Sequence, residues 1–180
     1  MFKKPSSRIF LSLAAFMLLM LSACSAFPYP TDAEDIRSIA DQIASYSAPE
    51  GYTEAFAIDL MGYQVVDLQG ITPSCHIYLV QAPEDTHVDV EKLQEQARSM
   101  DAGKRYKNPR EVRVVEQRMV TLRGESVTML VGEGVNADNM AYREITALFT
   151  GRGGPALVNM SAPVDQWDWD MVDQFLASME

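Results

Sequence analysis

The first 24 residues constrain this chain most, because they decide which part of it folds and in which compartment. Lys3, Lys4 and Arg8 form a positive head, and an apolar run follows from Phe10 to Leu21. A charged head, a short apolar run and small residues before a cleavage point are the layout of a secretory signal peptide. The run is shorter than the about 20 residues that a transmembrane helix needs. The sequence therefore predicts that residues 1–23 are removed and that the rest of the chain folds outside the cytoplasm.

The leader ends on Leu21-Ser22-Ala23-Cys24, which resembles the lipobox of bacterial lipoproteins. The resemblance implies that the thiol of Cys24 receives a diacylglyceryl group and that cleavage leaves this cysteine as the new N-terminus. We therefore expect a lipid anchor at Cys24; the alternative is an ordinary secreted protein whose cysteine falls there by chance. Stable anchoring takes more than one acyl chain, and a diacylated or triacylated cysteine meets that requirement. In a cell with two membranes, the lipoprotein sorting rules imply the periplasmic leaflet of the outer membrane, because Ser25 rather than aspartate follows the cysteine.

The charge of the chain argues against one class of partner. The full chain has a formal net charge of −10, and loss of the basic leader makes the mature chain more acidic still. Such a protein is soluble and is repelled by nucleic acid and by anionic lipid surfaces. We therefore expect no nucleic acid partner, and we expect the lipid rather than surface charge to hold the chain to the membrane. The second cysteine, Cys75, lies beside the apolar stretch Ile77–Val80 and is expected to be a buried, inert thiol.

Hydrophobic periodicity predicts the first half of the fold. Residues 24–31 comprise the lipidated cysteine and a short extended tether, because prolines disfavour helix there. A helix is predicted from an Asp32 cap to about Ser45. Alternating apolar residues then predict three strands, and a second helical pattern follows. The predicted strands cover residues 52–61, 63–68 and 76–81, the second helix covers residues 85–100, and a polar loop covers residues 101–110.

The second half is predicted to be mostly strand. The expected strands cover residues 112–122, 127–131, 142–150 and 156–160, with a break over residues 132–139 and a hairpin turn over residues 151–154. A closing helix is predicted over residues 165–179, with Asp165 as its N-cap and Asp168 in the capping-box position. The expected core residues are Val114, Met119, Val127, Met129, Val131, Ile145, Leu148 and Leu157. The order α-βββ-α-ββββ-α predicts one α+β domain over residues 32–180, with helices packed on a mostly antiparallel sheet of six or seven strands.

Two stretches carry a resemblance to a known fold family. One is the run from Gly51 to Leu68 that leads into Ile77–Gln81. The other is the ending Gly153-Gly154-Pro155-Ala156 followed by Trp167 and Phe175-Leu176. In this order they resemble the PsbP-like α/β/α sandwich domains, and also small bacterial lipoproteins. The resemblance implies a binding or assembly role and brings no catalytic motif with it.

Catalytic and metal chemistry find little support in the sequence. An EF-hand loop that starts at Asp165 would have Asp170 where glycine belongs and Ala177 where glutamate belongs, so the acidic stretch is interpreted as helix capping. The sequence around Ser126 has threonine in place of the second glycine of a nucleophile elbow. Cys75, His76 and His87 are too few for a convincing zinc site. Residues 151–154 precede a strand, which favours a turn over a phosphate loop. We expect no cofactor, no metal and no catalytic residue.

One charge asymmetry remains as a candidate binding feature. Eight of the twelve basic residues that follow the leader fall between Arg98 and Arg123. The centre of this run is Lys104, Arg105, Tyr106, Lys107 and Arg110, which would form a docking patch for an acidic partner or an anionic polymer. The alternative is a solvated loop and an edge strand, where Lys and Arg discourage pairing with other sheets.

Together these features predict a lipid-anchored, extracytoplasmic binding or assembly module that is not an enzyme. Its expected partners are the membrane, through the lipid on Cys24, and a protein of the cell envelope. One alternative is a small-ligand carrier or an enzyme with a pocket between sheet and helix that no motif discloses. Another is a structural lipoprotein that ties the membrane to the cell wall.

Overall fold

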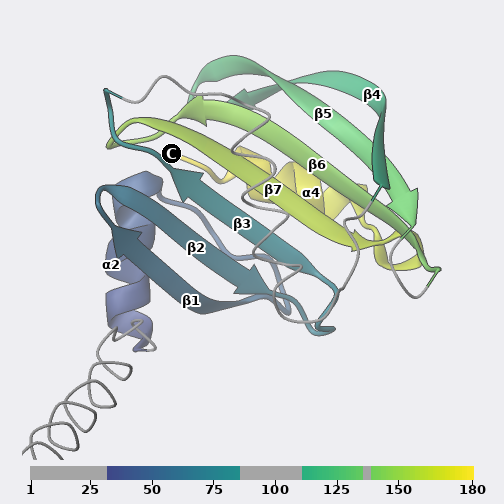
Figure 1. Ribbon diagram of the computed structural model, residues 1–180, viewed down its shortest axis with the longest axis horizontal. Helices are drawn as coiled ribbons and strands as arrows, with labels where there is room; N and C mark the ends of the chain where they lie inside the picture. The colour runs from purple at the N-terminus through teal and green to yellow at the C-terminus, as the bar shows by residue number, and fades with distance from the viewer. Residues whose placement is uncertain (1–31, 86–110, 136–138) are drawn as a thin grey trace, which may run out of the picture.

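The computed structural model describes residues 32–85, 111–135 and 139–180 (Figure 1). Over these residues, seven strands form one sheet in the order β1-β2-β3-β7-β6-β5-β4, and every neighbouring pair is antiparallel. The strands are β1 (Thr53–Leu60), β2 (Tyr63–Gln69), β3 (His76–Gln81), β4 (Glu111–Leu122), β5 (Glu125–Val135), β6 (Ala141–Thr150) and β7 (Pro155–Pro163). The helices are α2 (Ala33–Ile43), the 3-10 turn η1 (Val164–Gln166) and α4 (Trp169–Ala177). This arrangement confirms the predicted α+β sheet, while the helix predicted beyond Asp85 and the polar loop after it lie outside the described residues.

Both described helices pack on one face of the sheet (Figure 1). Ile36, Ala40 and Ile43 are buried on α2, and Val172, Phe175 and Leu176 are buried on α4. Their spacing of three and four residues places each set on one stripe of its helix. Burying a side chain the size of isoleucine or phenylalanine contributes about 1.5–3 kcal/mol, so each stripe holds its helix to the sheet. Neither described helix has the length and apolar character needed to cross a bilayer.

The second face of the sheet is also buried in its central strands, and it is partly polar. Val65, Tyr78, Val80 and Leu157 form an apolar cluster there. In the same cross-strand rows lie buried polar side chains: Asp67, His76, Glu144, Thr146, Asn159 and Ser161. Every residue of β3 is buried as a result. A strand buried on both faces is expected at the centre of a sheet that is covered on two sides.

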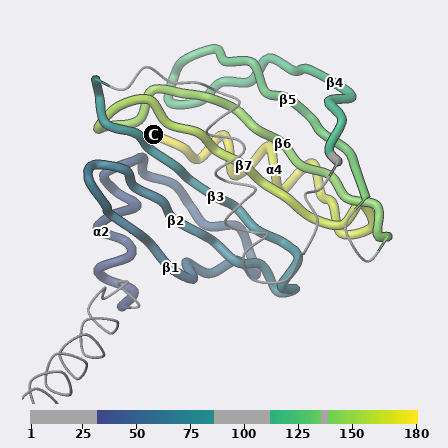
Figure 2. The backbone as a smooth tube through the Cα atoms, viewed as in Figure 1, coloured from purple at the N-terminus to yellow at the C-terminus, as the bar shows by residue number. Residues whose placement is uncertain are grey.

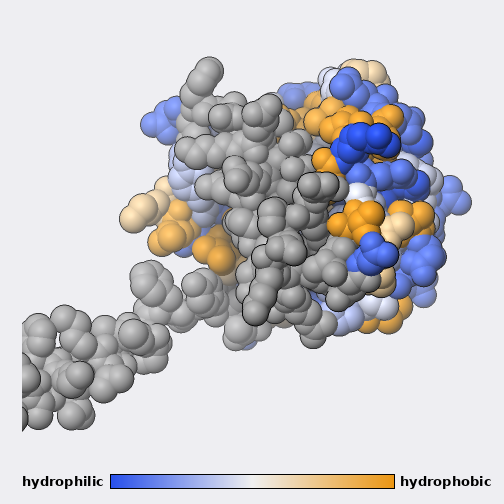
Figure 3. Space-filling view, turned by 45° about the vertical axis from the view of Figure 1, so that its right-hand side comes forward, coloured by the Kyte–Doolittle hydropathy of each residue, from blue (hydrophilic) through white to orange (hydrophobic). Residues whose placement is uncertain are grey.

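The edge strand β4 is more exposed than the sequence predicts. Met129, Val131, Ile145 and Leu157 are buried as expected, whereas Val127 and Leu148 are half-buried. Val114 and Met119 are 50% and 66% exposed, so their assignment to the core was wrong. Both lie on the outermost strand, which has a bulge between Val114 and Glu116. Figure 3 shows small orange groups of hydrophobic residues among blue hydrophilic ones on the coloured part of the surface.

The predicted break at Gly132 is wrong, because β5 continues to Val135. Gly132 pairs with Val114 on one side and with Glu144 on the other. A Cβ atom at Gly132 would lie 2.4 Å from Cγ1 of Val112, so glycine is needed here for close packing and not for a turn. β7 likewise runs beyond the predicted strand, to Pro163.

The closing helix begins later than predicted. Val164–Gln166 form a 3-10 turn, and α4 starts at Trp169 with Asp168 as its N-cap. The side chain of Asp168 accepts hydrogen bonds from the backbone N–H of Asp170 at 2.9 Å and of Met171 at 3.2 Å. The predicted cap at Asp165 was therefore wrong by one turn. Both positions carry the same residue type, and only tertiary packing distinguishes them.

Candidate binding groove

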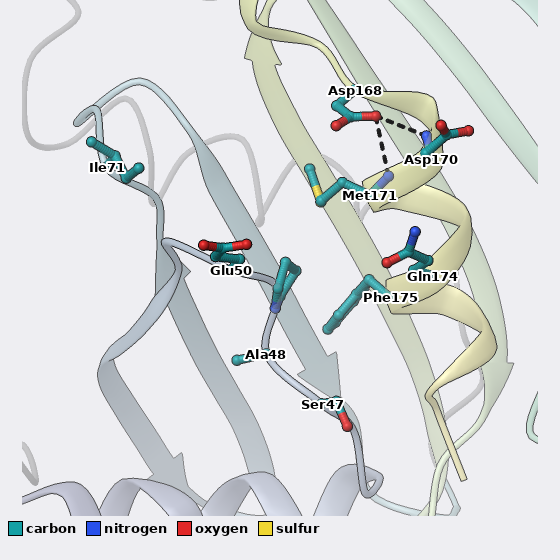
Figure 4. Close-up of a pocket in the computed structure, with 10 residues that line it drawn as sticks. Ser47, Ala48, Glu50, Ile71, Asp168, Asp170, Met171, Gln174 and Phe175 are labelled. Carbon is teal, nitrogen blue, oxygen red and sulfur yellow. Dashed lines mark hydrogen bonds between the residues drawn. The ribbon is translucent and has the colours of Figure 1, made fainter.

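A groove of about 630 Å³ opens between α4 and the extended segment 47–50 that follows α2 (Figure 4). A smaller hollow of about 210 Å³ shares Glu50, Ile71, Asp168 and Met171 with it. We call the two together the acidic groove. Its larger part is lined by Ser47, Ala48, Pro49, Glu50, Ile71, Asp168, Asp170, Met171, Gln174 and Phe175.

Backbone hydrogen bonds fix the two walls of the groove against each other. The backbone N–H of Ser45 donates to the carbonyl of Glu180, and the N–H of Glu180 donates to the carbonyl of Ser45, each at 2.9 Å. The N–H of Ser47 donates to Oγ of Ser178 at 3.0 Å. The C-terminus thus lies beside the chain that leaves α2, as Figure 2 shows. Because these contacts involve main chain on both sides, the groove is held open in a defined shape.

The floor of the groove is apolar. Phe175 is only 2% exposed, and its ring meets the ring of Tyr46 edge-on with 5.7 Å between centroids. The hydroxyl of Tyr46 donates to Oε1 of Glu54 at 2.7 Å. Burial and this hydrogen bond raise the pKa of Tyr46, so its hydroxyl stays a neutral donor. The ring of Phe175 therefore packs against a tyrosine whose hydroxyl is held in place by a hydrogen bond.

Ile71 stands at the far end of the groove, on the turn between β2 and β3. It is 87% exposed, which is unusual for a large aliphatic side chain next to a cavity. Its side chain lies over Gly51, where an added Cβ would come within 2.8 Å of Cδ1 of Ile71. Gly51 has a φ of +80° and so also supplies the tight turn before β1.

The rim of the groove is negatively charged. Glu50 stands on one wall and Asp168 stands at the start of α4 opposite, while the carboxylate of Asp170 is turned to the outer side of that helix (Figure 4). No lining residue of the described groove is basic. Among the described arginines, Arg37 pairs with Glu54 at 2.8 Å and Arg143 pairs with Glu133. None of the ion pairs between described residues includes Glu50, Asp168 or Asp170.

The narrow end of the groove holds Cys75. Its thiol is buried and lies 3.2 Å from Oγ1 of Thr72 and 3.4 Å from Oε1 of Gln166. The neighbouring Tyr52 has a raised pKa because of burial. Cys75 is thus a packed, hydrogen-bonded side chain, as the sequence predicts.

His76 has hydrogen-bond partners at both nitrogens of its buried ring. Its Nδ1 lies 3.0 Å from Oδ1 of Asp67, and its Nε2 lies 2.9 Å from the carbonyl of Pro73. Ser161 is its cross-strand neighbour on β7. A third partner of the ring is the hydroxyl of Tyr78, which lies 3.4 Å from Nδ1 and is able to donate to it. These contacts fix the orientation of the ring on β3.

Removing the acceptor beside His76 should destabilise the fold. We expect Asp67→Leu to cost about 1–3 kcal/mol, because the buried ring of His76 loses its carboxylate partner at Nδ1. Urea unfolding of the purified protein measures this cost. As a control, Asp173→Leu removes an exposed carboxylate of α4 and should change stability by no more than about 0.5 kcal/mol. Equal effects of the two substitutions would contradict a structural role for the Asp67–His76 pair.

The described part of the basic run is spread along β4. Arg118 pairs with Glu116 at 2.7 Å, and its guanidinium lies 3.9 Å from the ring centroid of Trp169. Its hydrogen bond lowers the pKa of Glu116. Arg123 donates to the carbonyl of Thr150, and Arg113 lies ten residues earlier, about 33 Å away along a strand. The centre of the predicted docking patch, Lys104, Arg105, Tyr106, Lys107 and Arg110, lies outside the described residues.

Sequence reasoning missed the groove and the residues that line it. Its walls come from residues 47–50 and 168–175, which no local motif connects. One signal was present: Ile71 is a lone aliphatic residue in the polar turn Gln69–Pro73. Within the residues that the structure describes, no three His, Cys, Asp or Glu side chains are grouped so as to hold a metal ion.

Comparison with known proteins supports the fold. No protein-family model matches the chain, and no curated protein sequence matches it. The fold is similar to the solution structure of cyanobacterial PsbP (CyanoP) from Synechocystis sp. PCC 6803, with a TM-score of 0.51 and 14% sequence identity. The similarity covers 78% of this chain and 87% of that chain. At this identity the likeness concerns the fold alone, and the chain therefore has a PsbP-like fold.

Proposed function

We propose that the chain is a lipid-anchored binding or assembly module that works outside the cytoplasm. The observation that carries the binding role is the acidic groove, which combines an apolar floor, a charged rim and walls tied by backbone hydrogen bonds. A site that already has its bound shape loses little conformational freedom when a partner enters. The PsbP-like fold is consistent with such a role.

The lipid anchor is the second part of the proposal. Cys24 would carry the acyl chains, and residues 25–31 would join it to α2, which begins at Ala33. Seven residues span at most about 25 Å when fully extended, so the domain stays near the bilayer. In a cell with two membranes we place it on the periplasmic leaflet of the outer membrane, because Ser25 follows the cysteine.

Binding rather than catalysis is the role that we assign to the groove. Asp168 already gives one carboxylate oxygen to two backbone N–H groups of α4. His76, the histidine within the described residues, lies on another part of the sheet and is bonded there to Asp67 and to the carbonyl of Pro73. A small-ligand carrier is the second candidate, because a volume of about 630 Å³ lies in the range of small-molecule sites.

Replacing Cys24 tests the anchor. We expect Cys24→Ser to abolish lipid attachment and to move the protein from the membrane pellet to the soluble fraction. Mass spectrometry of the purified N-terminus and fractionation at high salt measure the two effects. Cys75→Ser is the matched control, since it changes the buried thiol and should leave both processing and membrane binding intact. Normal processing and undiminished membrane binding of Cys24→Ser would overturn the anchor.

A further inference from the structure

We propose that the acidic groove binds a cationic segment of a partner protein. An arginine or lysine of that segment would lie at the rim between Glu50 and Asp168, with Asp170 near by, and an aliphatic neighbour would contact Met171 and Ile71. This inference rests on the proposed binding role and adds the chemistry of the partner.

The charges of the groove select a cation. The three rim carboxylates come from both walls, and the lining contains no lysine or arginine. Oδ1 of Asp168 is fixed by its bonds to the N–H groups of Asp170 and Met171, so this carboxylate is oriented before a partner arrives. Complementary charge across an interface speeds encounter and excludes partners of the same sign.

The helix N-terminus does not reverse this preference. The start of α4 carries a partial positive charge equivalent to about half an elementary charge, which by itself would favour an anion. Its N–H groups at Asp170 and Met171 are already taken by Asp168. The side chains of Asp168 and Asp170 together outweigh the partial charge, so an anionic ligand would meet net repulsion.

The apolar surface of the groove favours a peptide over a bare cation. Met171 and Phe175 line the floor, and the exposed Ile71 stands at its end. Apolar surface that a ligand buries adds to its affinity, and a metal ion or an inorganic cation has no such surface. A peptide that places an aliphatic side chain next to a basic one meets both the floor and the rim.

Peptide titration tests the inference on the full mature chain. The probe is a fluorescent heptapeptide of alternating arginine and leucine, and its companion has glutamine in place of each arginine. We expect the arginine peptide to bind at least tenfold more tightly at low salt than the glutamine peptide, and the difference to shrink at high salt. Spermidine alone at the same charge concentration should not displace it. Displacement by spermidine, or equal binding of the two peptides, would overturn the assignment of a protein segment.

A neutralised groove identifies the binding surface. We expect the affinity for the arginine peptide to fall about tenfold in the triple variant Glu50→Gln, Asp168→Asn, Asp170→Asn. Each exposed ion pair contributes only a small part of the binding free energy, so the three losses are combined. Asparagine is as good an N-cap as aspartate, so α4 should be kept. The double variant Glu50→Gln, Asp170→Asn alters no described hydrogen bond and should weaken binding severalfold even if the triple variant is unstable.

Asp35→Asn, Asp165→Asn and Asp173→Asn are the control, as they remove three carboxylates outside the groove. Equal effects of the groove and control sets would overturn the inference.

A cross-linking arm separates this inference from the binding role itself. A photoreactive residue at Gln174, which lines the groove, should capture a partner segment in intact cells, and mass spectrometry should find basic residues in that segment. Capture of an acidic or neutral segment would overturn the cationic partner and leave the binding role intact. Loss of all capture, together with no peptide binding, would overturn both.

Discussion

Replacing Gly154 with alanine should cost about 3 kcal/mol or more of the free energy of unfolding. Gly154 has a φ of +149°, a conformation that side chains with a Cβ rarely adopt. The added Cβ would lie 2.4 Å from the carbonyl oxygen of Ala82 and 2.9 Å from the backbone nitrogen of Glu84. Both are main-chain atoms, so no side chain can turn aside to make room. Backbone strain costs about 1–3 kcal/mol and overpacking costs about 1–3 kcal/mol more.

Gly124 provides the matched control. It also has a positive φ, of +78°, but a Cβ there would meet nothing within 4 Å. Gly124→Ala should therefore cost only the backbone term, about 1 kcal/mol. Urea unfolding of both variants measures the difference. Equal costs would mean that the close approach to Ala82 does not exist in solution.

The turn at Gly154 matters because it holds the end of α2. The N–H of Gly153 donates to Oε1 of Gln81 at 2.9 Å, and the N–H of Arg152 donates to the carbonyl of Ile43 at 3.0 Å. The guanidinium of Arg152 donates to the carbonyl of Asp41 at 2.6 Å. The last turn of α2 has no basic residue of its own, so Arg152 supplies the positive charge that its free carbonyls favour. The same end of α2 leads directly into the wall of the acidic groove.

Local signals were enough for the first half of the sheet. Asp32 caps α2 as predicted, by accepting from the N–H of Glu34, and β3 spans His76–Gln81 as predicted. Met61 and Gly62, both with positive φ, form the turn that separates the first two predicted strands. These features depend on residues close in sequence, whose preferences act over a few positions.

Features that depend on distant neighbours were missed. Gly132 has the local signature of a break, and only the side chain of Val112 on β4 shows why glycine is required inside β5. Asp165 and Asp168 are the same residue type and could each cap a helix, and in the folded chain Asp168 is the N-cap of α4. The acidic groove depends on segments more than a hundred residues apart, joined through Ser45 and Glu180. Local sequence patterns do not indicate which distant segments lie side by side in the fold.

Replacing Phe175 with alanine should give the second large effect, a loss of about 3–5 kcal/mol. Phe175 is nearly fully buried, and its removal leaves a cavity under α4 and deprives Tyr46 of its aromatic neighbour. Phe175→Leu keeps most of the volume and should cost no more than about 1.5 kcal/mol. Urea unfolding compares the two variants, and similar costs would show that the ring is not packed as described.

The part of the molecule that loses stability in Phe175→Ala should be as informative as the total cost. The amides of Ser45, Ser47 and Glu180 donate to partners across the groove, so they are protected only while α4 is docked. In Phe175→Ala we expect hydrogen exchange at these amides to accelerate more than exchange at Ile77, which lies in the doubly buried strand β3. Equal acceleration at all of these amides would mean that the molecule opens only as a whole. A selective effect would mean that the groove wall separates from the sheet on its own, and peptide binding in that variant should then weaken even where the sheet remains folded.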